Sequence, residues 1–196
     1  MPPCWRASIV PSRSSWRQRH DPCDAIPVGQ LFRGALCRRP RPWKFRSSPY
    51  EAAKYKATLA ALPRARYGSV LEIGCSIGVL TRMLAPRCDR LLALDGSARA
   101  LADARRHCAG LAQVSFAQRE IPRQWPRGRH DLILFSEVLY YLDEEDLART
   151  ATLALRALRP GGEVLLVHWT GTTDYPFRAM RRWTASWRRR GRRWSR

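Results

Sequence analysis

The chain has 196 residues, which is enough for one domain with a hydrophobic core and short for two. It carries 36 Lys and Arg against 16 Asp and Glu, a formal charge of +20, and no apolar run approaches the roughly 18 residues that cross a bilayer. The excess charge lies at the ends, because residues 1–46 hold 10 basic and 2 acidic residues and residues 177–196 hold 9 basic and no acidic ones. The middle has the composition of an ordinary globular domain, so the net charge alone does not indicate a nucleic-acid partner.

Two segments flank the predicted globular domain, residues 43–176. Residues 1–42 are rich in Arg, Pro and Trp, lack the apolar stretch of a secretory signal, and are expected to be disordered. In residues 177–196, Met180, Trp183 and Trp187 fall on one helical face among the arginines, as in a helix that binds a membrane or nucleic acid. Alternatively, neither end was selected for this fold, as happens when a start or reading frame is wrongly assigned.

The six cysteines form no C-x-x-C pair, so the sequence predicts no metal site. Three of them, Cys75, Cys88 and Cys108, stand at apolar positions and are expected to be buried thiols. We therefore expect a reducing compartment and a cytoplasmic protein.

Helices and strands alternate along the predicted domain. The first helix begins at Ser48, where a Ser-x-x-Glu capping box ends in Glu51, and stops at Pro63. Five apolar stretches follow, each typical of a buried strand: SVLEI, RLLALD, QVSFA, DLILFS and EVLLVHW. Helices are predicted near 77–85, after the cap Ser97, and from Asp143 to the Pro160-Gly161-Gly162 stop.

Strands that are apolar on both faces and alternate with helices predict a mostly parallel sheet covered by helices, the doubly wound α/β fold. Ligands of such sheets bind beyond the carboxyl ends of the strands. The candidate site residues are therefore those at the strand ends: Glu72–Gly78, Asp95, Gln118–Glu120, Ser136–Tyr141 and His168–Trp169.

The turn after the first apolar strand reads Gly74-Cys75-Ser76-Ile77-Gly78, and Asp95 follows about 20 residues later, a spacing typical of nucleoside sites in which the acid binds ribose hydroxyls. Ser76 and Val79 stand where the dinucleotide fingerprint G-x-G-x-x-G needs its second and third glycines. Glu72 would repel a phosphate and suits a cation. S-adenosylmethionine has a ribose, an ammonium and a sulfonium and no phosphate, so it fits this pattern, with Gly74 and Gly78 allowing close backbone approach.

Four segments, in this order and spacing, resemble the class I S-adenosylmethionine-dependent methyltransferases: LEIGCSIG, LALD, DLILFSEVLYYL and LRALRPGGEVLLV. Three stretches are similar to the nodulation protein S (NodS) family, whose members N-methylate the terminal glucosamine of a chitooligosaccharide: SPYEAAKYKATLAAL, EIGCSIGVLTRMLAPRCDRLLALD and SEVLYYL. The resemblance implies a Rossmann-like fold, S-adenosylmethionine as cofactor, and a small-molecule or oligosaccharide amine as acceptor. It implies no specific nucleic-acid partner and no integral membrane association.

The strand-end pattern and the resemblance together suggest a cofactor site of Tyr55, Glu72, Gly74, Cys75, Gly78, Asp95, Gly96, Glu120 and Ser136. The resemblance implies that Tyr55 lies near the methionine end of the cofactor and Glu120 near its adenine. Tyr140 and Trp169 are candidates for the acceptor site, with Trp169 stacking on a sugar or forming a hydrophobic lid.

Two residues are candidates for the base that takes the proton of the reacting amine, Glu137 first and His168 second. Glu137 has the alternatives of capping its turn or binding the cofactor. His168 has the alternative of packing at its strand end.

The end of the chain departs from the family pattern. A class I methyltransferase sheet has seven strands, but the 27 residues after Trp169 contain no strand pattern. We therefore expect a sheet that lacks the C-terminal hairpin and leaves the fifth apolar strand as an exposed edge. The alternative function is accordingly a truncated, non-catalytic methyltransferase-like domain whose basic ends bind nucleic acid or anionic membrane.

Overall fold

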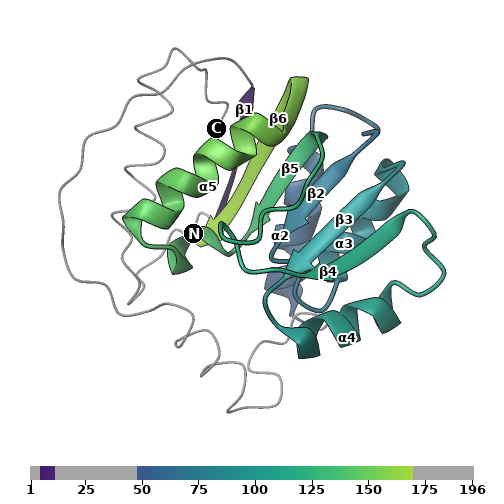
Figure 1. Ribbon diagram of the computed structural model, residues 1–196. Coiled ribbons are helices and arrows are strands. Elements are labelled where there is room, and N and C mark those ends of the chain that lie inside the picture. The colour runs from purple at the N-terminus through teal and green to yellow at the C-terminus, as the bar shows by residue number, and fades with distance from the viewer. Residues whose placement is uncertain (1–4, 12–47, 170–196) are drawn as a thin grey trace.

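The computed structural model describes residues 5–11 and 48–169, and the side chains of 48–167. Six strands form one sheet in the order β1-β6-β5-β2-β3-β4, with helices on both faces (Figure 1). The strands are β1 (Trp5–Pro11), β2 (Val70–Ile73), β3 (Leu91–Asp95), β4 (Val114–Gln118), β5 (His130–Ser136) and β6 (Leu158–Trp169). The helices are α2 (Pro49–Ala60), α3 (Val79–Leu84), η1 (Ala85–Arg87), α4 (Ala98–His107), η2 (Leu139–Tyr141) and α5 (Glu144–Ala157).

Strands β2 to β6 run parallel to one another, which confirms the predicted fold class. The sheet order places β2 between β3 and β5 at its centre, so their carboxyl ends, Ile73, Asp95 and Ser136, lie at the same edge of the sheet. The residues predicted at the ends of β2, β3 and β5 therefore lie at one edge of the sheet.

The prediction that the fifth apolar strand is an exposed edge is wrong. Strand β1 pairs antiparallel with β6, from Trp5 opposite Trp169 to Pro11 opposite Glu163. The N-terminal strand thereby bonds to the backbone groups that β6 would otherwise leave unpaired. The expectation of disorder is likewise wrong for Trp5–Pro11, and the rest of residues 1–42 and all of 177–196 lie outside the described residues.

Alternate residues of each strand face opposite layers of helices, as the period of two in a strand requires. On one face, Leu71, Ile73 and Phe135 pack with Leu147 and Ala151 of α5. On the other face, Val70, Leu132 and Leu165 pack with Tyr55 of α2 and with Leu80 and Leu84 of α3, and α4 adds a smaller cluster of Leu101 with Ala93 and Cys75. Figure 1 shows α5 in front of the sheet and α2 and α3 behind it. Glu72 is therefore on the face that α2 and α3 cover.

Each long helix begins where the sequence predicts it. The side chains of Ser48, Ser97 and Asp143 accept hydrogen bonds from the backbone N–H groups of Glu51, Ala100 and Asp146. Helix α5 ends at Ala157, earlier than the predicted stop at Pro160, because Leu158 already pairs with His130 of β5. The register between β5 and β6 is irregular at this point, and the Pro-Gly-Gly segment forms part of that irregularity.

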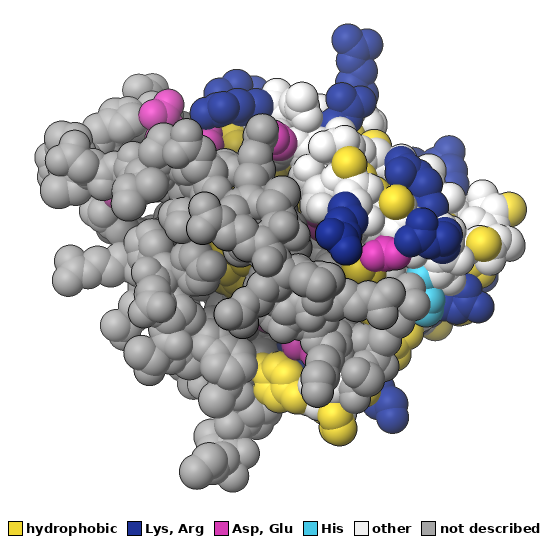
Figure 2. All heavy atoms as spheres, turned by 90° about the horizontal axis from the view of Figure 1, so that it is seen from below, with side chains coloured by type: hydrophobic (Ala, Val, Ile, Leu, Met, Phe, Trp, Pro, Cys, Tyr) yellow, Lys and Arg dark blue, Asp and Glu magenta, His cyan; other side chains and the backbone are white. Residues whose placement is uncertain are grey.

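The described surface carries charges of both signs. Figure 2 shows Lys and Arg side chains on the described part of one face, with acidic and apolar side chains among them. No described helix is long and apolar enough to cross a membrane.

Candidate active site

The glycine turn is tied to the neighbouring strand. The N–H groups of Gly74 and Cys75 both donate to the carbonyl oxygen of Leu94, at 2.8 and 3.0 Å. Gly74 has φ +86°, and a Cβ atom there would lie 2.3 Å from Cγ1 of Val138 and 2.5 Å from the carbonyl oxygen of Ser136. Close packing between the turn and the segment after β5 therefore already requires a glycine at this position.

Gly78 is also required by packing within the protein. Its φ is +78°, and a Cβ atom would lie 3.0 Å from Cβ of Ala104 on α4. Both glycines are predicted from the sequence to allow the close approach of a ligand, and the structure shows a second reason for each. The role of either residue in holding a cofactor stays a prediction.

Asp95 closes the turn from the end of β3. Its Oδ2 accepts a hydrogen bond of 2.8 Å from the N–H of Ser76, and its Oδ1 accepts one of 2.8 Å from the N–H of Ser97 at the start of α4. Burial raises the pKa of this carboxyl, and the N–H donors act in the opposite direction. Ser76 itself has φ +48°, so a non-glycine residue is held in a left-handed conformation at this turn.

Glu72 is completely buried beside the turn, with no exposed surface. Its Oε2 accepts a hydrogen bond of 2.7 Å from the hydroxyl of Thr81 on α3. Its Oε1 has no hydrogen-bond partner among the described residues. Burial raises the pKa of Glu72 to about 7 against the lowering effect of Thr81, and the nearby charge of Asp95 adds to the rise. The site thus holds an incompletely paired carboxyl that is poised between its neutral and charged forms at neutral pH.

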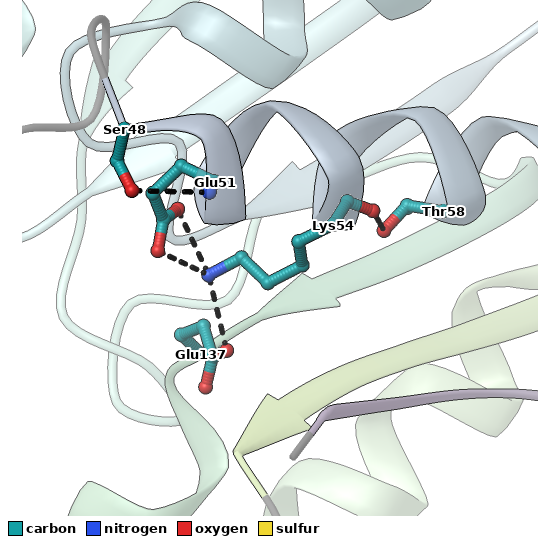
Figure 3. Close-up of polar contacts among 5 residues, drawn as sticks. All are labelled: Ser48, Glu51, Lys54, Thr58 and Glu137. Carbon is teal, nitrogen blue, oxygen red and sulfur yellow. Dashed lines mark hydrogen bonds and ion pairs between the residues drawn. The ribbon is translucent and has the colours of Figure 1, made fainter. Parts of the chain in front are cut away.

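Helix α2 contributes a buried lysine that contacts the segment after β5. Lys54 on α2 is 5% exposed, and its Nζ lies 3.0 Å from Oε2 of Glu51 and 3.3 Å from Oε1 of Glu137. Figure 3 shows its ammonium group between these two carboxylates. Glu137 follows β5, has φ +54°, and donates its N–H to the carbonyl oxygen of Val167 on β6. This ion pair joins α2 to a residue 83 positions later in the chain.

Tyr55, beside Lys54, is 8% exposed and packs in the core between α2 and the sheet. Burial raises the pKa of its phenol, and the charges of Glu51, Glu72 and Glu137 raise it further. Because all three carboxyls act on the Tyr55 phenol, Tyr55, Glu72 and Glu137 lie near one another. Together they form an acidic region at the carboxyl ends of β2 and β5.

The other predicted residues are spread around this region. The thiol of Cys75 is buried beside Ala93 and Leu101, and burial raises its pKa. The carbonyl oxygen of Gly96 accepts a hydrogen bond from Gln118, and Glu120 is exposed at the start of the loop after β4. Tyr140 and Tyr141 are half-buried, with ring centroids 4.5 Å apart. The backbones of His168 and Trp169 belong to β6, opposite Arg6 and Trp5, and their side chains lie outside the described residues.

Sequence reasoning missed two residues of this site, Lys54 and Thr81. Thr81 lies nine positions after Glu72, and nothing local marks it as the partner of that carboxyl. The one available signal for Lys54 was its place three positions after Glu51, which favours an ion pair on one helix face.

A glycine turn after the central strand, an acid at the end of the next strand and a mostly parallel sheet define a class I methyltransferase fold. A family model of Nodulation protein S (NodS) matches residues 27–168, and the chain belongs to this family. The match begins before residue 43, where the sequence analysis places the start of the domain.

The chain is similar to curated proteins and to solved structures. Nodulation protein S of Rhizobium tropici is 32% identical over 126 residues, which are 63% of this chain and 53% of the relative. The crystal structure of the N-methyltransferase NodS from Bradyrhizobium japonicum WM9 in complex with S-adenosyl-L-homocysteine is 29% identical, with a TM-score of 0.65 over 72% of each chain. The DhpI–SAM–HEP complex is 27% identical, with a TM-score of 0.63 over 82% of this chain and 73% of that one. The chain spans about half the length of the curated relatives it matches.

Proposed function

We propose that this chain is an S-adenosylmethionine-dependent N-methyltransferase. Membership of the NodS family and likeness to a NodS structure that holds S-adenosyl-L-homocysteine support the proposal. The observation that carries it is the buried carboxyl of Glu72, whose Oε1 has no hydrogen-bond partner in the described part of the chain. A buried carboxyl of this kind beside a glycine turn favours a ligand that carries a positive charge, because a nearby cation stabilises the ionised form.

The residues around the turn fit this cofactor. The Asp95 carboxylate accepts hydrogen bonds from the N–H groups of Ser76 and Ser97, and a carboxylate has about four acceptor sites, so it can also accept one from a ribose hydroxyl. We place the ammonium end of the cofactor on the side of Glu72 and Tyr55, because the carboxyls there favour a cation. The segment that Glu120 begins is the proposed place of the adenine.

The chemistry requires little acid or base strength from the protein. Bound S-adenosylmethionine supplies a methyl group attached to a positively charged sulfonium sulfur. The thioether that leaves is neutral, so it needs no activation by the protein. The lone pair of the acceptor nitrogen forms the new N–C bond while the C–S bond breaks, and its electrons stay on sulfur. The nitrogen then carries an extra proton, and we assign to the carboxylate of Glu137 the role of accepting it. Alignment of the two reactants contributes the larger share, up to about 7–11 kcal/mol, and a positioned base contributes about 10²–10⁴-fold.

We propose that the acceptor is the amine of an amino sugar, of the chitooligosaccharide kind that the NodS resemblance suggests. The rings of Tyr140 and Tyr141, whose centroids lie 4.5 Å apart with an angle of 55° between the planes, come shortly after Glu137 in the chain and offer aromatic surface for a sugar ring. His168 remains the second candidate for the base, and Trp169 a candidate for the acceptor site.

Calorimetry and a transfer assay test the proposal on the full chain. We expect wild-type protein to bind S-adenosylmethionine and to methylate a chitotetraose that carries one free amine on its terminal glucosamine. The variant Asp95→Ala removes both acceptors, and binding should weaken at least about 100-fold, the equivalent of about 3 kcal/mol. An exposed carboxyl on α5, changed in Glu145→Gln, is the matched control and should leave binding intact. Binding of NAD in place of S-adenosylmethionine would reject the proposal.

A further inference from the structure

Lys54 is an unusual residue for the middle of an amphipathic helix. Its side chain is 6% exposed, whereas its neighbour Lys56 on the same helix is exposed. Lysine is almost never buried without ionised partners, because removal of an ammonium group from water is costly. The structure provides those partners in Glu51 and Glu137, at 3.0 and 3.3 Å. Two tyrosine rings, those of Tyr50 and Tyr55, lie with their centroids 5.9 and 5.8 Å from the ammonium nitrogen.

The two carboxylates that contact Lys54 come from different parts of the chain. Glu51 lies one turn before Lys54 and makes a local ion pair within α2. Glu137 comes from the segment after β5, and its backbone is held at φ +54° with its N–H bonded to β6. Lys54 thus holds the carboxylate of Glu137, and the hydrogen bond to β6 holds the backbone of Glu137.

We propose that Lys54 is a positioning residue for methyl transfer, which holds the carboxylate of Glu137 in the orientation that faces the acceptor amine. This inference rests on the proposed function and extends it to a residue that does not touch the reacting atoms. A positive charge at 3.3 Å favours the carboxylate over the neutral acid, and only the carboxylate can take the proton of the amine. The ion pair to Glu51 holds Lys54 in place, so α2 acts on the reaction through Glu137.

The first experiment needs no acceptor. The side-chain carboxyls of glutamate are labelled with ¹³C, the resonance of Glu137 is assigned from the variant Glu137→Gln, and its titration is followed in wild type, Lys54→Met and Lys56→Met. We expect the midpoint for Glu137 to rise by about one pH unit in Lys54→Met, because the cation is removed. The midpoint should not change in Lys56→Met, because Lys56 is exposed on the same helix. An unchanged midpoint in Lys54→Met would overturn the inference, whatever the activity of the protein. Should Lys54→Met fail to fold, Lys54→Gln removes the charge and keeps two hydrogen-bond donors, and the same shift is expected.

The second experiment is a double-mutant cycle in kcat for methylation of the same glucosamine-terminated chitotetraose. Lys54→Met should lower kcat about 10–100-fold, because the Glu137 carboxylate is no longer held in position, and Glu137→Gln should lower it by at least as much. The double variant should be no slower than Glu137→Gln alone, within about threefold, because Lys54 acts through Glu137. Independent, multiplicative losses would show a general structural role and overturn the inference. A wild type that transfers no methyl group to any amine while the titration shift persists would reject the proposed function, and the catalytic role of Lys54 with it, but not the ion pair.

Discussion

Glu72→Gln tests the central electrostatic claim about the site, because it removes the charge of the buried carboxyl and keeps its shape. Burial raises the pKa of Glu72 from 4.5 to about 7. The folded state therefore binds a proton more tightly than the unfolded state, so ionisation of Glu72 costs stability as the pH rises from about 4.5 to about 7. A shift of this size corresponds to about 3 kcal/mol, and most of it, about 2–3 kcal/mol, falls between pH 5 and pH 8.

Urea unfolding at pH 5 and pH 8 measures this quantity. The free energy of unfolding of wild type minus that of Glu72→Gln should fall by about 2–3 kcal/mol from the lower pH to the higher. Glu145→Gln changes an exposed carboxyl on α5, and its difference from wild type should vary by less than about 0.5 kcal/mol over the same range. A difference for Glu72→Gln that does not depend on pH would refute the reasoning, because Glu72 would then have an ordinary environment.

The same carboxyl predicts a proton linkage in cofactor binding. A cationic ligand beside Glu72 favours its ionised form, so binding of S-adenosylmethionine at pH 7 should release about half a proton from a group whose pKa is about 7. Calorimetry in two buffers of different ionisation enthalpy gives this number, and Glu72→Gln should abolish the release. Equal release by wild type and variant would assign the proton to another group.

Three further predictions concern stability. Gly74→Ala places a Cβ atom 2.3 Å from Val138 at φ +86° and should cost about 3 kcal/mol or more in urea unfolding, whereas Gly110→Ala, at φ +85° with nothing within 4 Å, should cost about 1 kcal/mol. Burial and the charge of Arg159 lower the pKa of His130 despite the opposing charge of Asp131, so the stability that neutral His130 contributes should be lost as the pH falls below 6.5. Urea unfolding of wild type and His130→Gln at pH 7.5 and 5.5 measures this contribution, and a difference between the two proteins that is the same at both pH values would contradict it. Deletion of residues 1–11 should expose the edge of β6 and promote association, measured by light scattering, and a deletion variant that stays monomeric would contradict the protective role of β1.

The elements that the sequence predicts well are those with local signals. Ser48, Ser97 and Asp143 each precede a helix and bond to its first free N–H groups, so three or four adjacent residues determine the helix start. The five parallel strands are short apolar runs between glycine, proline and polar residues, and their alternation with helices limits the topology to a parallel sheet. Burial of Glu72 and Asp95 at the strand ends follows from the same pattern.

The features that the sequence analysis missed depend on contacts between distant residues. Strand β1 pairs with a strand that begins at residue 158, and nothing within Trp5–Pro11 specifies this partner. Its composition resembles that of the rest of residues 1–42, for which the sequence predicts disorder. The burial of Lys54 likewise depends on Glu137, 83 positions later, and a lysine on a helix is by default exposed. Such pairings follow from the completed fold and not from local propensity.

The balance of charge at the carboxyl ends of the strands also distinguishes between the two kinds of nucleoside ligand. Glu72 and Asp95 lie beside the glycine turn, Glu137 follows the next strand, and Glu51 lies on the helix that packs over them, with Lys54 paired to two of these carboxyls. A pyrophosphate would bring two negative charges into this set, where Glu72 already has a raised pKa because of burial and the charge of Asp95. A sulfonium and an ammonium would instead bring positive charge to Glu72, whose Oε1 has no hydrogen-bond partner among the described residues. The site therefore favours a cationic adenosyl donor over a dinucleotide for a reason that is independent of any glycine motif.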